Sequence, residues 1–152
     1  MKIPYTLLPS STPLGKVFIS KVPLVLLEFS EFYLNCLIDT GAVISMMPGE
    51  FGESLGLEIN KGEQFIISGI DNVAMPSYIH EVEFNINRVQ CKIEVVFSYN
   101  FKFPYGLLGR KDFFDLFKLH FYQKDNYFEL EDYWFIIKID IRSITYFSGL
   151  VL

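Results

Sequence analysis

The segment "NCLIDTGAVISMMP", residues 35–48, contains the residues of this 152-residue chain that are best suited to chemistry. Asp39 supplies a carboxylate, the Thr40 hydroxyl can hydrogen-bond to backbone and fix a loop, and Gly41 lets another chain approach closely. Apolar residues lie on both sides of this tripeptide, which places Asp39 at the edge of a core. A partly desolvated carboxylate held against a partner is suited to proton transfer near neutral pH.

The same tripeptide also has a purely structural interpretation. An aspartate with glycine two positions later is common turn chemistry, so Asp39 could simply close a hairpin. Average residue usage predicts Asp-Thr/Ser-Gly by chance in roughly a few of every hundred chains of this length. The surrounding sequence therefore has to decide between the two interpretations.

The elements that must position Asp39 are predicted to be strands. Phenylalanine, tyrosine and β-branched residues fall in short runs between turn residues, which favours a mostly β protein. Residues 22–29 and 32–38 predict a hairpin whose second strand ends at Asp39. An extended run over 44–47 follows, and then a short helix that begins at Pro48 and closes at Gly56.

The rest of the chain continues this alternation of strands and turns. A longer hairpin is predicted over residues 64–70 and 77–86, and one more strand over 89–97. A short helix is predicted over 111–119, and a last pair of strands over 119–122 and 127–130. The helix rests on the spacing of Phe113, Phe114 and Phe117, which we expect to pack in the core. After Glu131 the pattern "IIKIDIRSI" predicts an amphipathic strand over 136–144.

Composition limits the classes of function. About half of the residues are hydrophobic, enough for one domain with a real core. The net charge is −5 and the basic residues are scattered, so nucleic acid is not an expected partner. Prolines at 4, 9 and 13 interrupt any signal-peptide core, and three charges within residues 133–152 argue against a membrane span. We therefore expect a soluble, cytoplasmic protein.

Neither a metal nor another cofactor is expected. Cys36 and Cys91 lie far apart with no CxxC spacing and no histidine close to them in the sequence, which indicates two buried reduced thiols. His80 and His120 are similarly isolated, so no set of metal ligands is apparent.

Three blocks in order resemble the retropepsin-like aspartic protease family. They are "LIDTGA" at the Asp39 loop, "FIISGI" at residues 65–70 in the place of the family's flap hairpin, and "GLLGRKDFFDLF" at residues 106–117, which is similar to the apolar pair and Gly-Arg before its single helix. The opening "IPYTLLPSSTPLGKV" and the pair "HFYQKDNYFEL" resemble small prokaryotic members. The resemblance covers about residues 3–131.

The resemblance implies a closed β-barrel, the acid protease fold, with one or two short helices and activity as a homodimer. Residues 1–131 would form the protease domain. No other aspartate of the chain is followed by Thr or Ser and then Gly, so the second catalytic Asp39 must come from a second chain. The two carboxylates would share one proton, and together activate a water against the carbonyl of an extended polypeptide, without metal or covalent intermediate.

The resemblance also implies roles for other residues. Thr40 would lock the two loops across the dimer, and Gly41 would hydrogen-bond the substrate backbone. The flap, with Ser68, Gly69 and Ile70, would close over the peptide. Gly109 and Arg110 would support the loop. The apolar walls of the subsites would be formed by Ala42, Val43, Ile70, Pro104 and Leu107.

The sequence departs from the retroviral pattern at Val43, where relatives often have an aspartate that pairs with the arginine of the second block. Arg110 could instead pair with Asp112, Asp115 or a backbone carbonyl, or stay solvated. The segment 132–152 could extend a dimer interface or be disordered. Two other functions remain open: a noncatalytic peptide-binding or dimerisation module on the same fold, and a monomeric, decayed protein.

Overall fold

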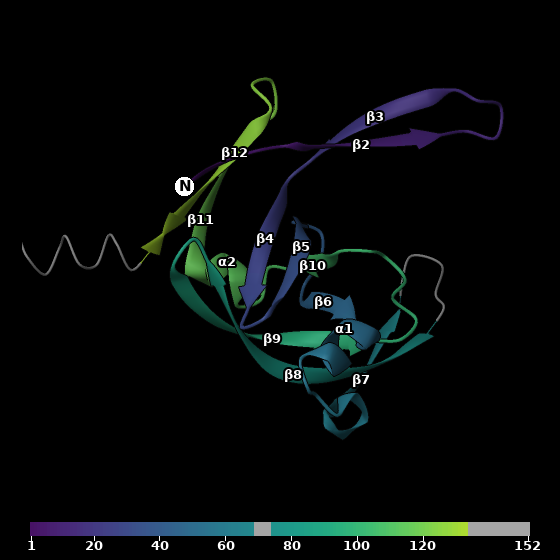
Figure 1. The fold of residues 1–152 in the computed structure, drawn as a ribbon, viewed down its shortest axis with the longest axis vertical. Helices are drawn as coiled ribbons and strands as arrows, with labels where there is room; N and C mark the ends of the chain where they lie inside the picture. The colour runs from purple at the N-terminus through teal and green to yellow at the C-terminus, as the bar shows by residue number, and fades with distance from the viewer. Residues whose placement is uncertain (69–73, 134–152) are drawn as a thin grey trace, which may run out of the picture.

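Most of the chain is β-strand, as its composition predicts. The structure, a computed structural model, describes residues 1–68 and 74–133 (Figure 1). The strands are β1 (Lys2–Pro4), β2 (Thr6–Ser11), β3 (Val17–Val22), β4 (Leu24–Phe29), β5 (Phe32–Ile38), β6 (Ser45–Pro48), β7 (Glu63–Ser68), β8 (Ala74–Ile86), β9 (Val89–Ser98), β10 (Gly106–Leu108), β11 (Phe117–Tyr122) and β12 (Tyr127–Asp132).

Six of these strands close into a barrel. Their order is β4, β5, β10, β6, β9 and β8, and β8 pairs back to β4 through Asn85 and Glu28. β7 pairs with residues 74–79 at the start of β8, and this pair is the predicted long hairpin. The expectation of a mostly β, closed barrel is confirmed.

The barrel is closed around an apolar core. Along β4 the side chains of Val25, Leu27 and Phe29 are buried while those between them face solvent, which is the two-residue period of a half-buried strand. β9 and β10 add fully buried side chains such as Phe97 and Leu108. The predicted hairpin before Asp39 is present as β4 and β5, joined at Ser30 and Glu31.

Two α-helices are present in the described residues, and one is shorter than predicted. α1 (Gly49–Ser54) follows Pro48 and is succeeded by Gly56 at φ +83°, close to the prediction. The predicted helix over 111–119 is wrong at both ends, because α2 covers only Phe113–Leu116. From Phe117 onwards the chain pairs as β11 with β12, and those sheet hydrogen bonds end the helix. A 3₁₀ turn, η1 (Ile59–Lys61), precedes β7.

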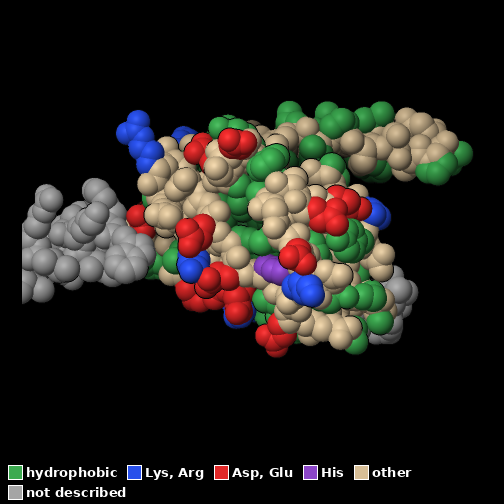
Figure 2. Space-filling view, turned by 60° about the horizontal axis from the view of Figure 1, so that its bottom comes forward, with side chains coloured by type: hydrophobic (Ala, Val, Ile, Leu, Met, Phe, Trp, Pro, Cys, Tyr) green, Lys and Arg blue, Asp and Glu red, His purple; other side chains and the backbone are tan. Residues whose placement is uncertain are grey.

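The N-terminal segment forms strands that the sequence reading did not predict. β1 pairs with β12, which also pairs with β11, so the two ends of the described chain meet in one three-stranded sheet. β2 and β3 form a separate two-stranded hairpin, joined by residues 12–16, which we call the arm. The arm projects beyond the barrel in both views (Figure 1, Figure 2).

Some predictions fall outside the described residues. Gly69 and Ile70 of the predicted flap lie within residues 69–73, and the amphipathic strand predicted over 136–144 lies within residues 134–152, both outside the described ranges. In the part of the chain that is described, no helix has the length and apolar character needed to cross a membrane.

Candidate active site

Asp39 lies at the end of β5 in a loop that fixes its carboxylate. The Asp39 N–H donates to the carbonyl oxygen of Leu108 at 3.0 Å, which ties the loop to the end of β10. The Gly41 N–H donates to Asp39 Oδ1 at 2.8 Å, so the carboxylate is held by backbone of its own loop. Asp39 is half-buried and Thr40 is exposed, which leaves one side of the loop open to a partner.

The block at residues 106–111 lies directly beside the Asp39 loop. β10 runs parallel to β5 with Leu108 opposite Ile38, and two further backbone hydrogen bonds join the loops that follow. The Arg110 N–H donates to the Ala42 oxygen at 3.0 Å, and the Lys111 N–H donates to the Val43 oxygen at 2.7 Å. Two sequence blocks almost 70 positions apart thus form one rigid unit around the carboxylate.

Gly109 and Ser45 form a buried contact that supports this unit. The Gly109 N–H donates to Ser45 Oγ at 3.1 Å, and Ser45 is completely buried. A Cβ on Gly109 would lie 2.5 Å from the carbonyl carbon of Ile44, so no side chain fits there. The sequence reading identified Gly109 as support and missed Ser45. A single small polar residue within the apolar run 42–47 was the available signal, because a buried hydroxyl requires a partner.

An apolar pocket of about 670 Å³ opens beside the loop. Three of the predicted subsite residues, Ala42, Val43 and Leu107, contribute to its wall. The other lining residues come from β6, the β7–β8 hairpin, and the segments that precede β10 and α2: Ile44, Met46, Phe65, Ile66, Ile67, Met75, Ile79, Phe101, Phe103 and Lys111. The sequence reading missed them because they converge only when β7 and β8 pair.

The other predicted site residues lie around this pocket or outside the described chain. Pro104 is exposed and is not part of the pocket lining, although its neighbour Phe103 is. Ser68 ends β7, where it pairs with Ala74 of β8, so the described part of the hairpin stops just short of the predicted flap tip.

The charged residues just before α2 show which of the alternatives for Arg110 applies in the described chain. The Arg110 side chain makes no hydrogen bond or ion pair with any residue in the described ranges, and it is exposed. Asp112 instead accepts a hydrogen bond from the Glu94 N–H at 3.0 Å. The Lys111 ammonium pairs with the Glu94 carboxylate, which raises the pKa of Lys111 and places one ion pair at the pocket rim.

The two cysteines and His80 take structural positions. Cys36 and Cys91 are free and buried, and burial raises the pKa of the Cys36 thiol and raises that of Cys91 to about 12. His80 Nε2 lies 2.9 Å from the Ile59 carbonyl oxygen. Within residues 1–68 and 74–133, no three His, Cys, Asp or Glu side chains are grouped so that they could hold a metal ion.

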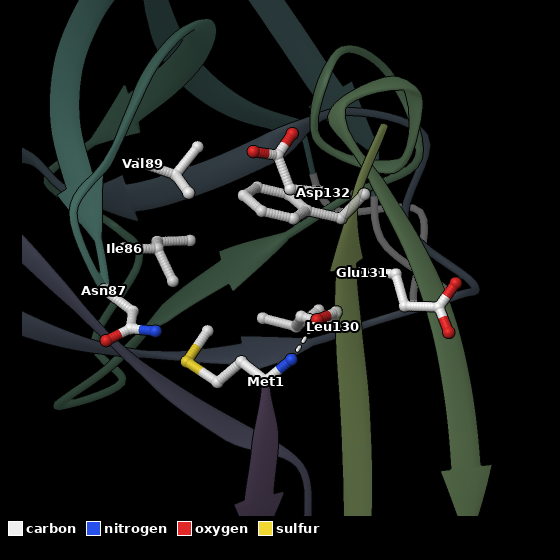
Figure 3. Close-up of a pocket in the computed structure, with 8 residues that line it drawn as sticks. Met1, Ile86, Asn87, Val89, Leu130, Glu131 and Asp132 are labelled. Carbon is white, nitrogen blue, oxygen red and sulfur yellow. Dashed lines mark hydrogen bonds between the residues drawn. The ribbon is translucent and has the colours of Figure 1, made fainter. Parts of the chain in front are cut away.

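A second pocket, of about 390 Å³, contains none of the predicted site residues (Figure 3). Its walls come from Met1, which precedes β1, from the adjoining ends of β8 and β9 with the turn between them, and from β11 and β12. The Met1 ammonium donates to the Leu130 carbonyl oxygen at 2.6 Å on one side of it, and the apolar side chains of Ile86 and Val89 face it from the other. The Asp39 loop is not part of this pocket.

Solved structures with a similar fold are retropepsin-like proteins. A retropepsin-like aspartic protease from Rickettsia conorii aligns with a TM-score of 0.56 at 14% identity, over 84% of this chain and 95% of that one. The retroviral protease-like domain of Ddi1 from Leishmania major aligns with a TM-score of 0.53 at 14% identity, over 74% and 90% of the two chains. No family model and no curated protein sequence matches this chain.

A longer viral protein also aligns. The foamy viral protease-reverse transcriptase, solved with an RNA/DNA hybrid, has a TM-score of 0.45 and 24% identity over 60% of this chain. This chain spans only 11% of that protein's length.

The fold of this protein is therefore retropepsin-like. Its barrel is closed, and the loop with Asp39, Thr40 and Gly41 follows the barrel strand β5 and lies beside an apolar pocket. At these identities, the similarity establishes the fold and leaves activity to be argued from the site.

Proposed function

We propose that this protein is an aspartic endopeptidase that acts as a homodimer, with one Asp39 from each chain. The observation that carries the proposal is the Asp39 loop itself. Its carboxylate is half-buried, is oriented by the Gly41 N–H at 2.8 Å, and lies in a loop that also lines a 670 Å³ apolar pocket. Because no other Asp-Thr/Ser-Gly occurs in the sequence, a second chain has to supply the second carboxylate.

The proposed chemistry is general acid–base catalysis by the pair. Two carboxylates a few ångström apart share one proton, since both cannot ionise easily. The ionised Asp39 takes a proton from a bound water, which attacks the peptide carbonyl carbon, while the protonated Asp39 donates to the carbonyl oxygen. The Asp39 that took the water proton then donates it to the amide nitrogen, the other Asp39 takes a proton from a hydroxyl of the tetrahedral intermediate, and the C–N bond breaks as the carbonyl forms again, which restores the pair. Thr40, exposed beside each carboxylate, would join the two loops.

The proposed substrate is an extended polypeptide with apolar side chains near the cut. The pocket wall is formed almost entirely by aliphatic and aromatic residues, and Lys111, the only charged residue among the described lining residues, is paired with Glu94. Removing apolar side chains of a substrate from water would contribute about 25 cal/mol per Å² of buried area. The flap predicted around Ser68, Gly69 and Ile70 would add strand-like hydrogen bonds, as would Gly41.

The test compares cleavage by the wild type, Asp39→Asn and Asp125→Asn. A diverse mixture of unstructured peptides is incubated from about pH 4 to 7, and the products are identified by mass spectrometry. Asp125 is an exposed turn aspartate, so its variant is a matched control for the loss of one carboxylate. We expect wild type and Asp125→Asn to cut beside apolar residues, and Asp39→Asn to lose at least about a hundredfold in rate. Equal cleavage by all three would overturn the proposal.

A noncatalytic peptide-binding module is the second candidate. It is favoured by Val43, which is 63% exposed where retroviral relatives carry a charged partner for the arginine, and by the lack of a described partner for Arg110. In that case none of the three proteins would cut at any pH, although all would dimerise and bind apolar peptides.

A further inference from the structure

The arm formed by β2 and β3 carries an apolar face that nothing in the described chain covers. Directly opposed residues of an antiparallel pair share one face, which places Leu7 opposite Lys21, Pro9 opposite Ile19, and Ser11 opposite Val17. The exposed fractions are 57% for Leu7, and 64% for both Val17 and Ile19.

The other face of the arm is less exposed. There Leu8 and Val22 are half-buried, and Phe18, 46% exposed, lies beneath the Lys16 ammonium at 5.0 Å from its ring centroid. β2 and β3 hydrogen-bond as strands only to each other among the described strands. An isolated two-stranded hairpin is marginal in water, so the arm needs a surface to pack on.

The arm begins beside the proposed catalytic loop. Pro23, which follows β3, accepts a hydrogen bond from the Ile38 N–H at 3.0 Å, and Ile38 directly precedes Asp39. The six residues of β3 span about 20 Å, at roughly 3.4 Å for each strand residue. If two Asp39 loops face each other, each arm starts at the contact between chains, and a strand of this length is long enough to cross onto the other barrel.

The charges of arm and barrel are complementary. Residues 6–22 contain Lys16 and Lys21 and no acidic residue, so the arm has a charge of +2. Since the net charge of the whole chain is −5, the remaining residues together have a charge of −7. Figure 2 shows acidic side chains gathered over the barrel while the arm bears hydrophobic ones. An acidic protein surface attracts a basic, apolar arm and repels a second acidic barrel, so the arm offsets part of the repulsion between two copies.

We infer that the arm is a clasp for a second copy of this chain, and that the face with Leu7, Pro9, Val17 and Ile19 packs on the partner's barrel. This inference rests on the proposed homodimer for its geometry. It assigns a dimer contact to a hairpin that precedes the barrel in the sequence and contributes no residue to the pocket beside Asp39.

The test measures the dimer dissociation constant by sedimentation equilibrium for the wild type, Ile19→Ser, Leu7→Ser with Ile19→Ser, and Phe18→Ser. Phe18→Ser is the matched control, since it makes the same kind of change one residue away on the opposite face. We expect Ile19→Ser to weaken the dimer about tenfold and the double variant about a hundredfold or more, with less than a threefold effect for Phe18→Ser. Thermal unfolding of each variant verifies that the barrel remains folded.

The outcomes separate this inference from the proposed function. A dimer that Ile19→Ser and the double variant leave unchanged, or that Phe18→Ser weakens equally, overturns the clasp even where Asp39 is required for cleavage. A dimer that depends on the arm but cuts no peptide supports the clasp and overturns the peptidase. A wild type that stays monomeric at every concentration overturns both. Loss of peptide binding by the double variant with an unchanged dimer would assign the arm to substrate instead.

Discussion

At the scale of single residues, Asp39 is held by main-chain groups, and no side chain within residues 1–68 and 74–133 hydrogen-bonds to it. Its N–H is bound by Leu108, its carboxylate accepts from Gly41, and the loop is joined to the segment after β10 by Arg110 and Lys111 backbone donors. Backbone hydrogen bonds of this kind do not depend on a flexible partner, so the loop is preorganised in one chain. The second carboxylate is what a single chain cannot supply.

Ser45 is the side chain on which this unit most depends. Ser45→Ala removes the oxygen that accepts from the Gly109 N–H and leaves that buried donor without a partner. We expect the free energy of unfolding, measured with urea, to fall by about 1–3 kcal/mol. Ser54→Ala is the control: Ser54 is exposed and its hydroxyl donates to Phe51 O, so the loss should stay below about 0.5 kcal/mol. Equal losses for the two variants would contradict the assigned role of Ser45.

At the scale of elements, the turns that join barrel strands set the register of the sheet. Asn87 and Arg88, between β8 and β9, have φ values of +46° and +72°, as a two-residue hairpin turn with both central residues left-handed requires. In this conformation the Cβ crowds the following carbonyl; Asn tolerates it because its short polar side chain can hydrogen-bond to nearby backbone, which the arginine side chain does not do. Exposed Arg88 is therefore a strained position within an otherwise regular hairpin.

Replacing that arginine should stabilise the barrel. We expect Arg88→Gly to raise the free energy of unfolding by about 0.5–1 kcal/mol, because glycine adopts the left-handed region without steric cost. Lys124→Gly, in the turn between β11 and β12, is the control, since Lys124 is not among the positive-φ residues. That change should be neutral or destabilising, and urea midpoints of the two variants measure the difference. A midpoint lowered by Arg88→Gly would count against the turn assignment.

At the scale of the whole molecule, the two thiols link stability to pH. Cys36 and Cys91 are buried, and burial raises both pKa values above the ordinary 8.5 or so. Below that pH both thiols are protonated in the folded and in the unfolded chain, and their full contribution to the free energy of unfolding is present. Above it only the unfolded chain ionises, so stability falls as pH rises towards the folded pKa, about 12 for Cys91.

We expect this slope to be about 1.4 kcal/mol per pH unit for each thiol above pH 9. Urea unfolding at pH 8, 9 and 10 measures it for the wild type and for Cys91→Ala, which should lose one thiol's share of the slope whatever its stability at pH 8. Identical slopes would show that the Cys91 thiol ionises as easily in the folded protein as in the unfolded one.

The sequence by itself determined the local elements and the chemical identity of the loop. Short runs of aromatic and β-branched residues between turn residues predicted β4, β5, β8 and β9, because such residues favour strands. Asp39, Thr40 and Gly41 were recognisable because their chemistry is carried by residue type and adjacency. The spacing of the phenylalanines suggested a helix beyond Leu116, and local spacing could not include the pairing of β11 with β12 that ends it.

Only the tertiary structure decided which distant residues meet. The hydroxyl of Ser45 beneath Gly109, and the pocket wall from Phe65, Met75 and Phe101, arise from strand pairing across long sequence separations. The arm was not predicted for another reason: its prolines and serines are residue types typical of turns, and its pairing gives it a face only when both strands are aligned. Non-local hydrogen bonds create these surfaces, and a linear pattern carries no record of which strands will form them.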